Sequence, residues 1–463
     1  MVEELEGWEQ TLTAGPLLLI AAAAIAALLV LIIKLKMHAF VALIVISFLT
    51  AVAAGIPFGA VVPVMLDGFG GTLASVALLV GLGAMLGRLL ETSGGAQVLA
   101  EKLISIFGEK RAPLALGVAS LLFGFPIFFD AGLVVMLPVV FAVARRLGGS
   151  VLLYALPSVG AFSVMHVFLP PHPGPVTAST FFEANVGLVL LVGLVAALPA
   201  WYLSSYLFGK VMGRRIDLPV PSILGEAEAV QNPPKTGTVV LILLLPMLLI
   251  FLNTGLDFLR AAGAVSEDAV WYGILTTFGA SPVALLISVL VALIVLGFRR
   301  GENGTALEKI VDSSLGPICS VVLITGAGGM FGGVLRTSGI GDALADSMSN
   351  LGIPVLLAAW LIAAALRIAQ GSATVALTTA AALMVPAVEA GAYSGVQLAL
   401  IVLATAAGSV IASHVNDSGF WLVGRLMGLD VATTLKTWTV NQTLIAVIGL
   451  LLTSVFYGIT LVV

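Results

Sequence analysis

Ionisable side chains are scarce in this chain, and a few of them interrupt long apolar stretches. Asp130 follows the sequence GFPIFF in one such stretch, and Arg367 precedes the sequence IAQGSAT in another. His166 and His414 each end an apolar stretch, and each is followed by valine. Such groups are costly to bury without a partner, so a carboxyl, a guanidinium and imidazoles in apolar surroundings indicate proton transfer or the binding of a polar solute.

The residues after Arg367 add hydroxyl and amide groups. Gln370, Ser372 and Thr374 could bond a polyol or a carboxylate, and Arg367 could pair directly with an anion. The alternative is that Ser372 and Thr374 only cap the next helix while Arg367 bonds nearby carbonyls. Asp130 has the same two interpretations, a proton-carrying carboxyl or a helix cap.

A segment that should interrupt the helix follows each of the two repeated histidines. After His166 the sequence LPPHPGP (169–175) contains four prolines, so we expect this segment not to be helical. After His414 come Asn416 and Asp417, which are candidate polar ligands. Imidazole titrates near neutral pH, so either histidine could join a proton relay or bond substrate hydroxyls, although a histidine in a membrane often serves only packing. His172 is a further candidate for the relay, unless it lies in an external loop.

Composition and an internal repeat define the class of protein. The 463 residues are 60% hydrophobic and only 10% charged, which excludes an ordinary soluble domain. The single cysteine, Cys319, excludes a disulfide framework and cysteine-based metal sites. The sequence GLGAMLGRLLETSGG (81–95) returns as GAGGMFGGVLRTSGI (326–340), at an offset of 245 (326 − 81). An apolar chain built twice from one plan is typical of secondary transporters.

Hydropathy predicts an all-α polytopic membrane protein with about ten transmembrane helices and two re-entrant hairpins. Two apolar stretches, 112–144 and 353–390, are too long for one helix and are broken near the middle, so we interpret them as the hairpins. Trp438, near the start of the last span, is expected to anchor at the membrane interface. The expected spans are 15–33, 38–56, 72–90, 150–168, 184–207, 237–252, 272–297, 315–336, 396–415 and 438–462.

The distribution of basic residues predicts the topology. With the N-terminus outside, only Arg260, Arg336 and Arg367 of the 20 Lys and Arg residues avoid the cytoplasmic side, which leaves 17 there. Each half contains five spans and one hairpin, so the second half must be inverted. We therefore expect a first repeat at 1–207, a cytoplasmic linker at 208–236 and a second repeat at 237–463. The hairpin tips would then meet near the midplane, where helix N-termini favour an anion such as a carboxylate.

Four long blocks carry a family resemblance. The sequences GFPIFFDAGLVVMLP (124–138), HVFLPPHPGP (166–175), LRIAQGSATVA (366–376) and SHVNDSGFW (413–421) resemble the signature blocks of the gluconate permease family. This resemblance implies proton-coupled uptake of gluconate or a related sugar acid by a homodimer in the bacterial inner membrane, with elevator-type movement of a transport domain. It also adds Phe125 and Gly371, at the two hairpin tips, to the expected substrate site.

Several alternatives stay open at this point. Other substrates that the resemblance allows are ketogluconates, glycerate and other hydroxy acids, and D-serine. A single buried cation, Arg367, favours a monocarboxylate. Asp130, Asp417 and the histidines favour protons as the coupling ion, but backbone carbonyls at broken helices could bind sodium instead. A channel and a membrane-embedded hydrolase are distant alternatives. We expect no enzymatic activity, no cofactor, no bound metal and no nucleic-acid partner.

Overall fold

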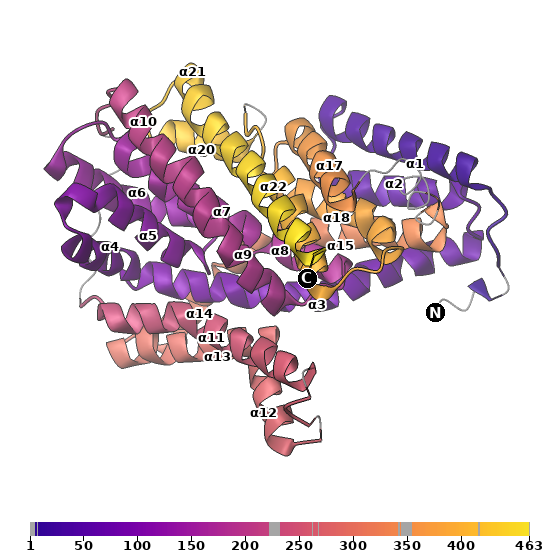
Figure 1. Cartoon of the computed structure of the whole chain (residues 1–463), viewed down its shortest axis with the longest axis horizontal. Helices are drawn as coiled ribbons and strands as arrows, with labels where there is room; N and C mark the ends of the chain where they lie inside the picture. Colours follow the sequence, from indigo (N-terminus) through magenta and orange to yellow (C-terminus); the bar gives the residue numbers. More distant parts are fainter. Residues whose placement is uncertain are drawn as a thin grey trace.

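The structure is a computed structural model that describes residues 5–6, 8–221, 232–261, 263–266, 268–340, 343, 354–414 and 417–462. Within these ranges every regular element is a helix, as the sequence predicts. Figure 1 shows the helices packed side by side in one body, with α3 running along most of its length. The helices of the first half are α1 (Ala14–Leu29), α2 (Ala39–Ala53), α3 (Phe58–Thr92), α4 (Gly95–Phe107), α5 (Ala112–Gly124), α6 (Phe129–Leu147), α7 (Leu152–Phe168), α8 (Pro173–Phe181), α9 (Val186–Trp201), η4 (Tyr202–Leu207) and α10 (Phe208–Arg215).

The second half has the same order of elements around the repeated motif. The motif lies in α3 and again in α15, and each is later followed by two apolar helices separated by a short break, then by a helix, a second break and a long final helix. The helices of this half are α11 (Thr236–Ala261), α12 (Val270–Gly279), α13 (Ser281–Ala292), α14 (Gly304–Asp312), α15 (Leu315–Thr337), α17 (Val355–Gln370), α18 (Ala373–Glu389), α19 (Gly395–Gly408), α20 (Ser418–Leu426), α21 (Val431–Thr434), η7 (Leu435–Thr439) and α22 (Val440–Thr460).

Seven helical segments in the described ranges are long and apolar enough to cross a membrane. Helices α1, α2 and α19 are apolar but shorter than these.

Several boundaries differ from the sequence prediction. Helix α3 begins at Phe58 instead of residue 72, α11 continues to Ala261 instead of residue 252, and α19 ends at Gly408 instead of residue 415. The prediction that 169–175 is not helical is wrong for its last residues, because α8 begins at Pro173 and proline is tolerated in the first turn of a helix. The expected span 272–297 is divided at Ala280, because Pro282 begins a new helix there. The helix expected to end at 207 continues through π-helical η4 to Arg215, eight residues into the expected linker.

The contact between α3 and α15 depends on small residues. A side chain on Gly68 would collide with the carbonyl group of Gly329, and a side chain on Gly329 would collide with Thr72. Gly87 on α3 has a similar role toward the first hairpin, because a Cβ atom there would lie 2.6 Å from the carbonyl oxygen of Pro126. Glycine therefore lets the broken segment after α5 lie directly against α3.

Each stretch that we interpret as a hairpin consists of two helices with a short break. Helices α5 and α6 contain 13 and 19 residues, and the four residues between them include Pro126. Helices α17 and α18 contain 16 and 17 residues. Gly371 ends α17 with φ +81°, a left-handed conformation that favours glycine. Local chemistry thus explains both breaks.

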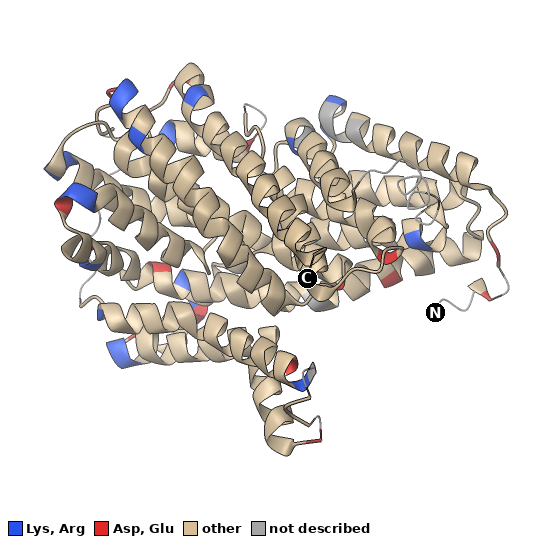
Figure 2. Cartoon of the chain, viewed as in Figure 1, with Lys and Arg blue, Asp and Glu red and all other residues tan. Residues whose placement is uncertain are grey.

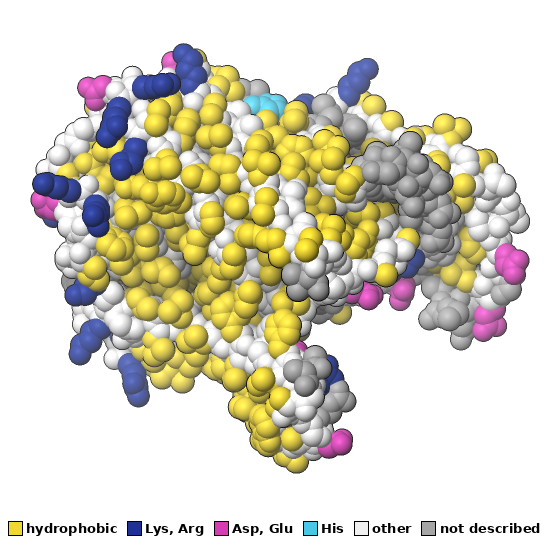
Figure 3. Space-filling model, in the orientation of Figure 1, with side chains coloured by type: hydrophobic (Ala, Val, Ile, Leu, Met, Phe, Trp, Pro, Cys, Tyr) yellow, Lys and Arg dark blue, Asp and Glu magenta, His cyan; other side chains and the backbone are white. Residues whose placement is uncertain are grey.

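The molecular surface separates apolar from basic residues. In Figure 3 hydrophobic side chains cover most of the visible face, while Lys and Arg lie along its edge. Figure 2 shows most of the visible Lys and Arg at the end of the molecule formed by α4, α6, α10 and α14. A broad apolar face bordered by charge is what a bilayer requires of a multi-pass protein.

Candidate functional site

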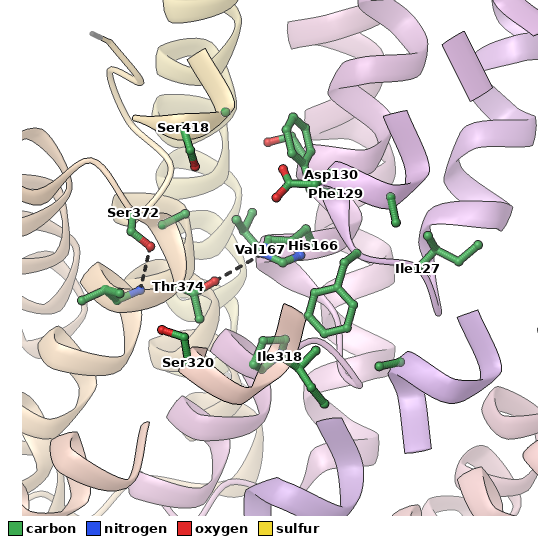
Figure 4. Close-up of a pocket in the computed structure, with 18 of the residues that line it drawn as sticks. Ile127, Phe129, Asp130, His166, Val167, Ile318, Ser320, Ser372, Thr374 and Ser418 are labelled. Carbon is green, nitrogen blue, oxygen red and sulfur yellow. Dashed lines mark hydrogen bonds between the residues drawn. The ribbon is translucent and has the colours of Figure 1, made fainter. Parts of the chain in front are cut away.

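The four sequence blocks with unusual polar residues surround one cavity of about 610 Å³. The break between α5 and α6 contributes Pro126 to Ala131, and the break between α17 and α18 contributes Ser372 to Val375. Helix α7 contributes His166, and the start of α20 contributes Asp417 to Gly419. In Figure 4, Asp130, His166, Ser372, Thr374 and Ser418 lie around this common space, although they come from helices far apart in the sequence.

Three helices have their N-termini in the wall of this cavity. Helix α18 begins after Ser372, whose Oγ accepts a hydrogen bond from the backbone N–H of Val375 at 3.4 Å. Helix α20 begins after Asp417, whose Oδ1 accepts from the backbone N–H of Gly419 at 2.9 Å. Helix α6 begins after Phe128 and has no side-chain cap. Unpaired N–H groups and the partial positive charge at such ends favour an anion.

Arg367 is buried, with 3% of its surface exposed, and it is already paired. One terminal nitrogen donates to the carbonyl oxygen of Gly371, and the other forms an ion pair with the carboxylate of Asp417. The structure thus provides this guanidinium with an internal counter-ion, and its direct binding of the substrate anion stays a prediction. The Nε atom of Arg367 is buried and has no hydrogen-bond partner within the described residues.

Asp417 joins two distant parts of the chain through a small polar network. Besides Arg367, its carboxylate accepts a hydrogen bond from the hydroxyl of Ser413. Trp438 donates through Nε1 to the same Ser413 oxygen at 2.7 Å. The prediction of Trp438 as an interface anchor is wrong, since the side chain is only 2% exposed and lines the cavity. The centroid of its ring lies 5.4 Å from the centroid of the Phe129 ring.

Two histidines lie together beside the cavity. The Nε2 atom of His166 lies 3.3 Å from Oγ1 of Thr374, which links α7 to the start of α18 (Figure 4). The ring of His172 lies 4.8 Å from that of His166, and its Nε2 is 2.9 Å from the carbonyl oxygen of Gly124. His172 is buried, so the alternative of an external loop is wrong for it. The Nδ1 atom of His166 is buried without a partner in the described structure.

Asp130 is the one described carboxylate in the cavity wall without an ion pair. It is exposed to the cavity and lies in the first turn of α6. Asp417 is a second carboxylate in the same wall, but it is paired with Arg367. A carboxylate that faces the cavity without an ion pair suits a group that exchanges a proton.

Some predicted residues lie beside the cavity instead of in its wall. Phe125, Gly371 and His172 are buried behind it, and the Nε2 atom of His414 lies 3.0 Å from the carbonyl oxygen of Ile368, outside the wall. Asn416 lies outside the described residues. Nothing is described of the side chain of Gln370.

The structure also adds residues that sequence reasoning missed. Ser163 donates through Oγ to Oε1 of Gln442 at 2.7 Å, and both line the cavity. An amide in an apolar span was the available signal for Gln442. Arg88 and Glu91 on α3 line the cavity as well, although the sequence prediction assigned Arg88 to the basic side of the membrane. Within the described residues no three His, Cys, Asp or Glu side chains are grouped as metal ligands would be.

Comparison with known proteins identifies the family. A sequence profile described as GntP family permease matches residues 16–459 of the chain. The chain belongs to this permease family. It is 40% identical to a gluconate permease of Pseudomonas aeruginosa over 440 residues, which cover 94% of this chain and 96% of that protein. A gluconate permease of Bacillus subtilis is also 40% identical over 440 residues, with 94% of this chain and 97% of that protein covered.

A solved transporter structure has a similar fold. The structure of the YdaH transporter of Alcanivorax borkumensis matches with a TM-score of 0.60 at 15% identity, covering 88% of this chain and 90% of that one. The GntP family resemblance expected from the sequence is therefore confirmed. The chain is a multi-pass membrane transporter of a family that includes gluconate permeases, and not an enzyme.

Proposed function

We propose that this protein imports gluconate, or a closely related sugar acid, together with one proton. The observation that carries the proposal is the balance of charges around the cavity. Its wall contains two cationic side chains, Arg88 and Arg367, and three carboxylates, Glu91, Asp130 and Asp417. With all five ionised the net charge is −1 (2 − 3), and an entering monoanion would change it to −2.

A proton restores that balance. Uptake of one proton with each monoanion leaves the net charge of the cavity at −1, so the pair enters at no electrostatic cost beyond that of the empty site. Asp130 is the best carrier, because it faces the cavity and lacks an ion pair. Asp417 is the second carrier in this proposal, and the neighbouring His172 joins the relay through His166.

The same wall offers a belt of partners for a polyol. The N-termini of α6 and α18 would hold the carboxylate, since their free N–H groups and dipoles are directed at the cavity. Ser372, Thr374, His166 and Gln442 would bond hydroxyl groups. A volume near 610 Å³ is in the usual range for a small-ligand site. This set favours a hydroxylated monocarboxylate over a purely apolar acid.

Transport further requires alternating access. We propose that the two halves are inverted with respect to each other, that α5–α6 and α17–α18 are re-entrant hairpins, and that these move together as an elevator within a homodimer. The repeated order of elements around α3 and α15 supports this arrangement. The location in this proposal is a bacterial inner membrane, with the N-terminus outside and the linker in the cytoplasm.

Transport by purified protein in proteoliposomes tests the proposal. An inward gradient of one pH unit should accumulate labelled gluconate up to about tenfold, because one proton contributes roughly 1.4 kcal/mol per pH unit. A 1:1 symport of a monoanion and a proton moves no net charge, so a potassium diffusion potential alone should drive no accumulation. Accumulation that follows the potential or a sodium gradient would contradict the proton mechanism. Competition by ketogluconate, glycerate and D-serine ranks the substrates.

A further inference from the structure

The ion pair between Arg88 and Glu91 lines the cavity and has no role in the site described so far. Nη1 of Arg88 is 2.6 Å from Oε1 of Glu91, three residues later on α3. Nε of Arg88 also donates to Oγ of Ser313, before α15, at 3.2 Å. All three residues line the cavity beside Gly87, the residue that admits the α5–α6 break.

The two cations of the cavity are held very differently. The side chain of Arg367 is 4% exposed and is bonded to a carboxylate on another helix. The side chain of Arg88 is 38% exposed, and its only ion-pair partner in the described structure is on its own helix. The ion pair itself joins no two elements, although Arg88 also bonds Ser313, and a pair with a solvent-accessible member contributes about 0–1 kcal/mol to stability. Fold stability is therefore a weak reason to place these charges here.

We propose that Arg88 is a further binding residue for the carboxylate of the transported acid, in addition to the N-termini of α6 and α18. Its guanidinium is the more accessible of the two cations, and its five N–H donors allow it to bind an anion while it still holds Glu91, whose side chain is only 13% exposed. Arg367 is 4% exposed, and its two terminal nitrogens already bond Gly371 and Asp417. In this inference Glu91 is a positioning residue that holds Arg88 and competes with the substrate for it. The inference rests on the proposed function, since it assumes an anionic substrate.

Binding of labelled gluconate to purified protein tests the inference with two opposite variants. Arg88→Gln should raise the dissociation constant by about fivefold, which is the upper end of what a partly exposed ion pair contributes. Glu91→Gln should strengthen binding by about twofold, because it removes the competing carboxylate. Raising the salt concentration should weaken binding to the wild type more than to Arg88→Gln, because screening acts on the exposed charge.

Arg336→Gln is the matched control. Arg336 pairs with Glu389 at 2.8 Å, is 54% exposed and does not line the cavity, so its loss should leave binding unchanged. Weaker binding in both Arg88→Gln and Glu91→Gln would overturn the inference, because it would show a merely structural pair. Unchanged binding in Arg88→Gln would overturn it too. In either case the proposed function would stand as long as the wild-type protein binds gluconate. A wild-type protein that binds no sugar acid would overturn both.

Discussion

Removal of either partner of the Arg367–Asp417 pair should have unequal effects on stability. Both side chains are buried, at 4% and 9% exposure, so each single variant leaves one charged group without its counter-ion. Loss of one partner of a buried pair costs about 3–5 kcal/mol. Asp417→Asn strands a guanidinium that cannot lose its proton, so it should suffer the full cost at any pH.

Arg367→Gln differs because a stranded carboxyl can be neutralised. Protonating an aspartate side chain in water costs about 4 kcal/mol at pH 7 and about 1.5 kcal/mol at pH 5. Its stability should therefore recover by about 2.5 kcal/mol between these pH values, while that of Asp417→Asn should not. The double variant Arg367→Gln/Asp417→Asn removes both charges and should be more stable than Asp417→Asn.

The assay is thermal inactivation of detergent-solubilised protein, followed by the monodisperse fraction on size exclusion at pH 7 and pH 5. Arg336→Gln serves as the control, since its ion pair is exposed and should contribute little. Equal melting of the two single variants at pH 5, or a double variant no better than Asp417→Asn, would refute the reasoning. Such a result would mean that the pair contributes no coupling energy and that Arg367 is held by Gly371 alone.

Three further variants test other parts of the site. Asp130→Asn should abolish accumulation driven by a pH gradient while gluconate counterflow continues; undiminished accumulation would remove Asp130 from the proton path. Ser372→Ala should lower stability by about 1 kcal/mol and also weaken gluconate uptake. Ser394→Ala removes the exposed cap of α19 and should lower only stability. Equal uptake kinetics in the two variants would contradict a substrate role for Ser372. Trp438→Phe keeps an aromatic ring but loses the hydrogen bond to Ser413, so its melting temperature should be lower than that of the wild type. An unchanged melting temperature would show that this network does not support the site.

Local chemistry made much of the site predictable. Gly371 and Pro126 lie at breaks in apolar helices, because a left-handed residue ends a helix and the missing N–H group of proline weakens one. Asp130 and Arg367 are conspicuous for the same reason, since an ion in apolar surroundings needs a partner or a function. The pattern therefore indicated which segments to expect around a cavity.

The partners of these groups depend on distances that no local pattern contains. Asp417 follows Arg367 by 50 residues, and only the packing of α20 beside the end of α17 makes it the counter-ion. Trp438 has the hydropathy of an interface residue, yet the π-helical η7 turns it inward toward Ser413. Arg88 carries the charge expected of a membrane boundary, and only the approach of α3 to the first break places it at the cavity.

The sequence by itself determined that this chain is helical, spans a membrane, is built on a repeated plan and belongs to the GntP permease family, because hydropathy, glycine and proline act locally and the signature blocks are contiguous. The tertiary structure decided which charges neutralise each other and which remain available. Coulomb energy depends on separation and burial, and both are set only when helices that are distant in the sequence pack together.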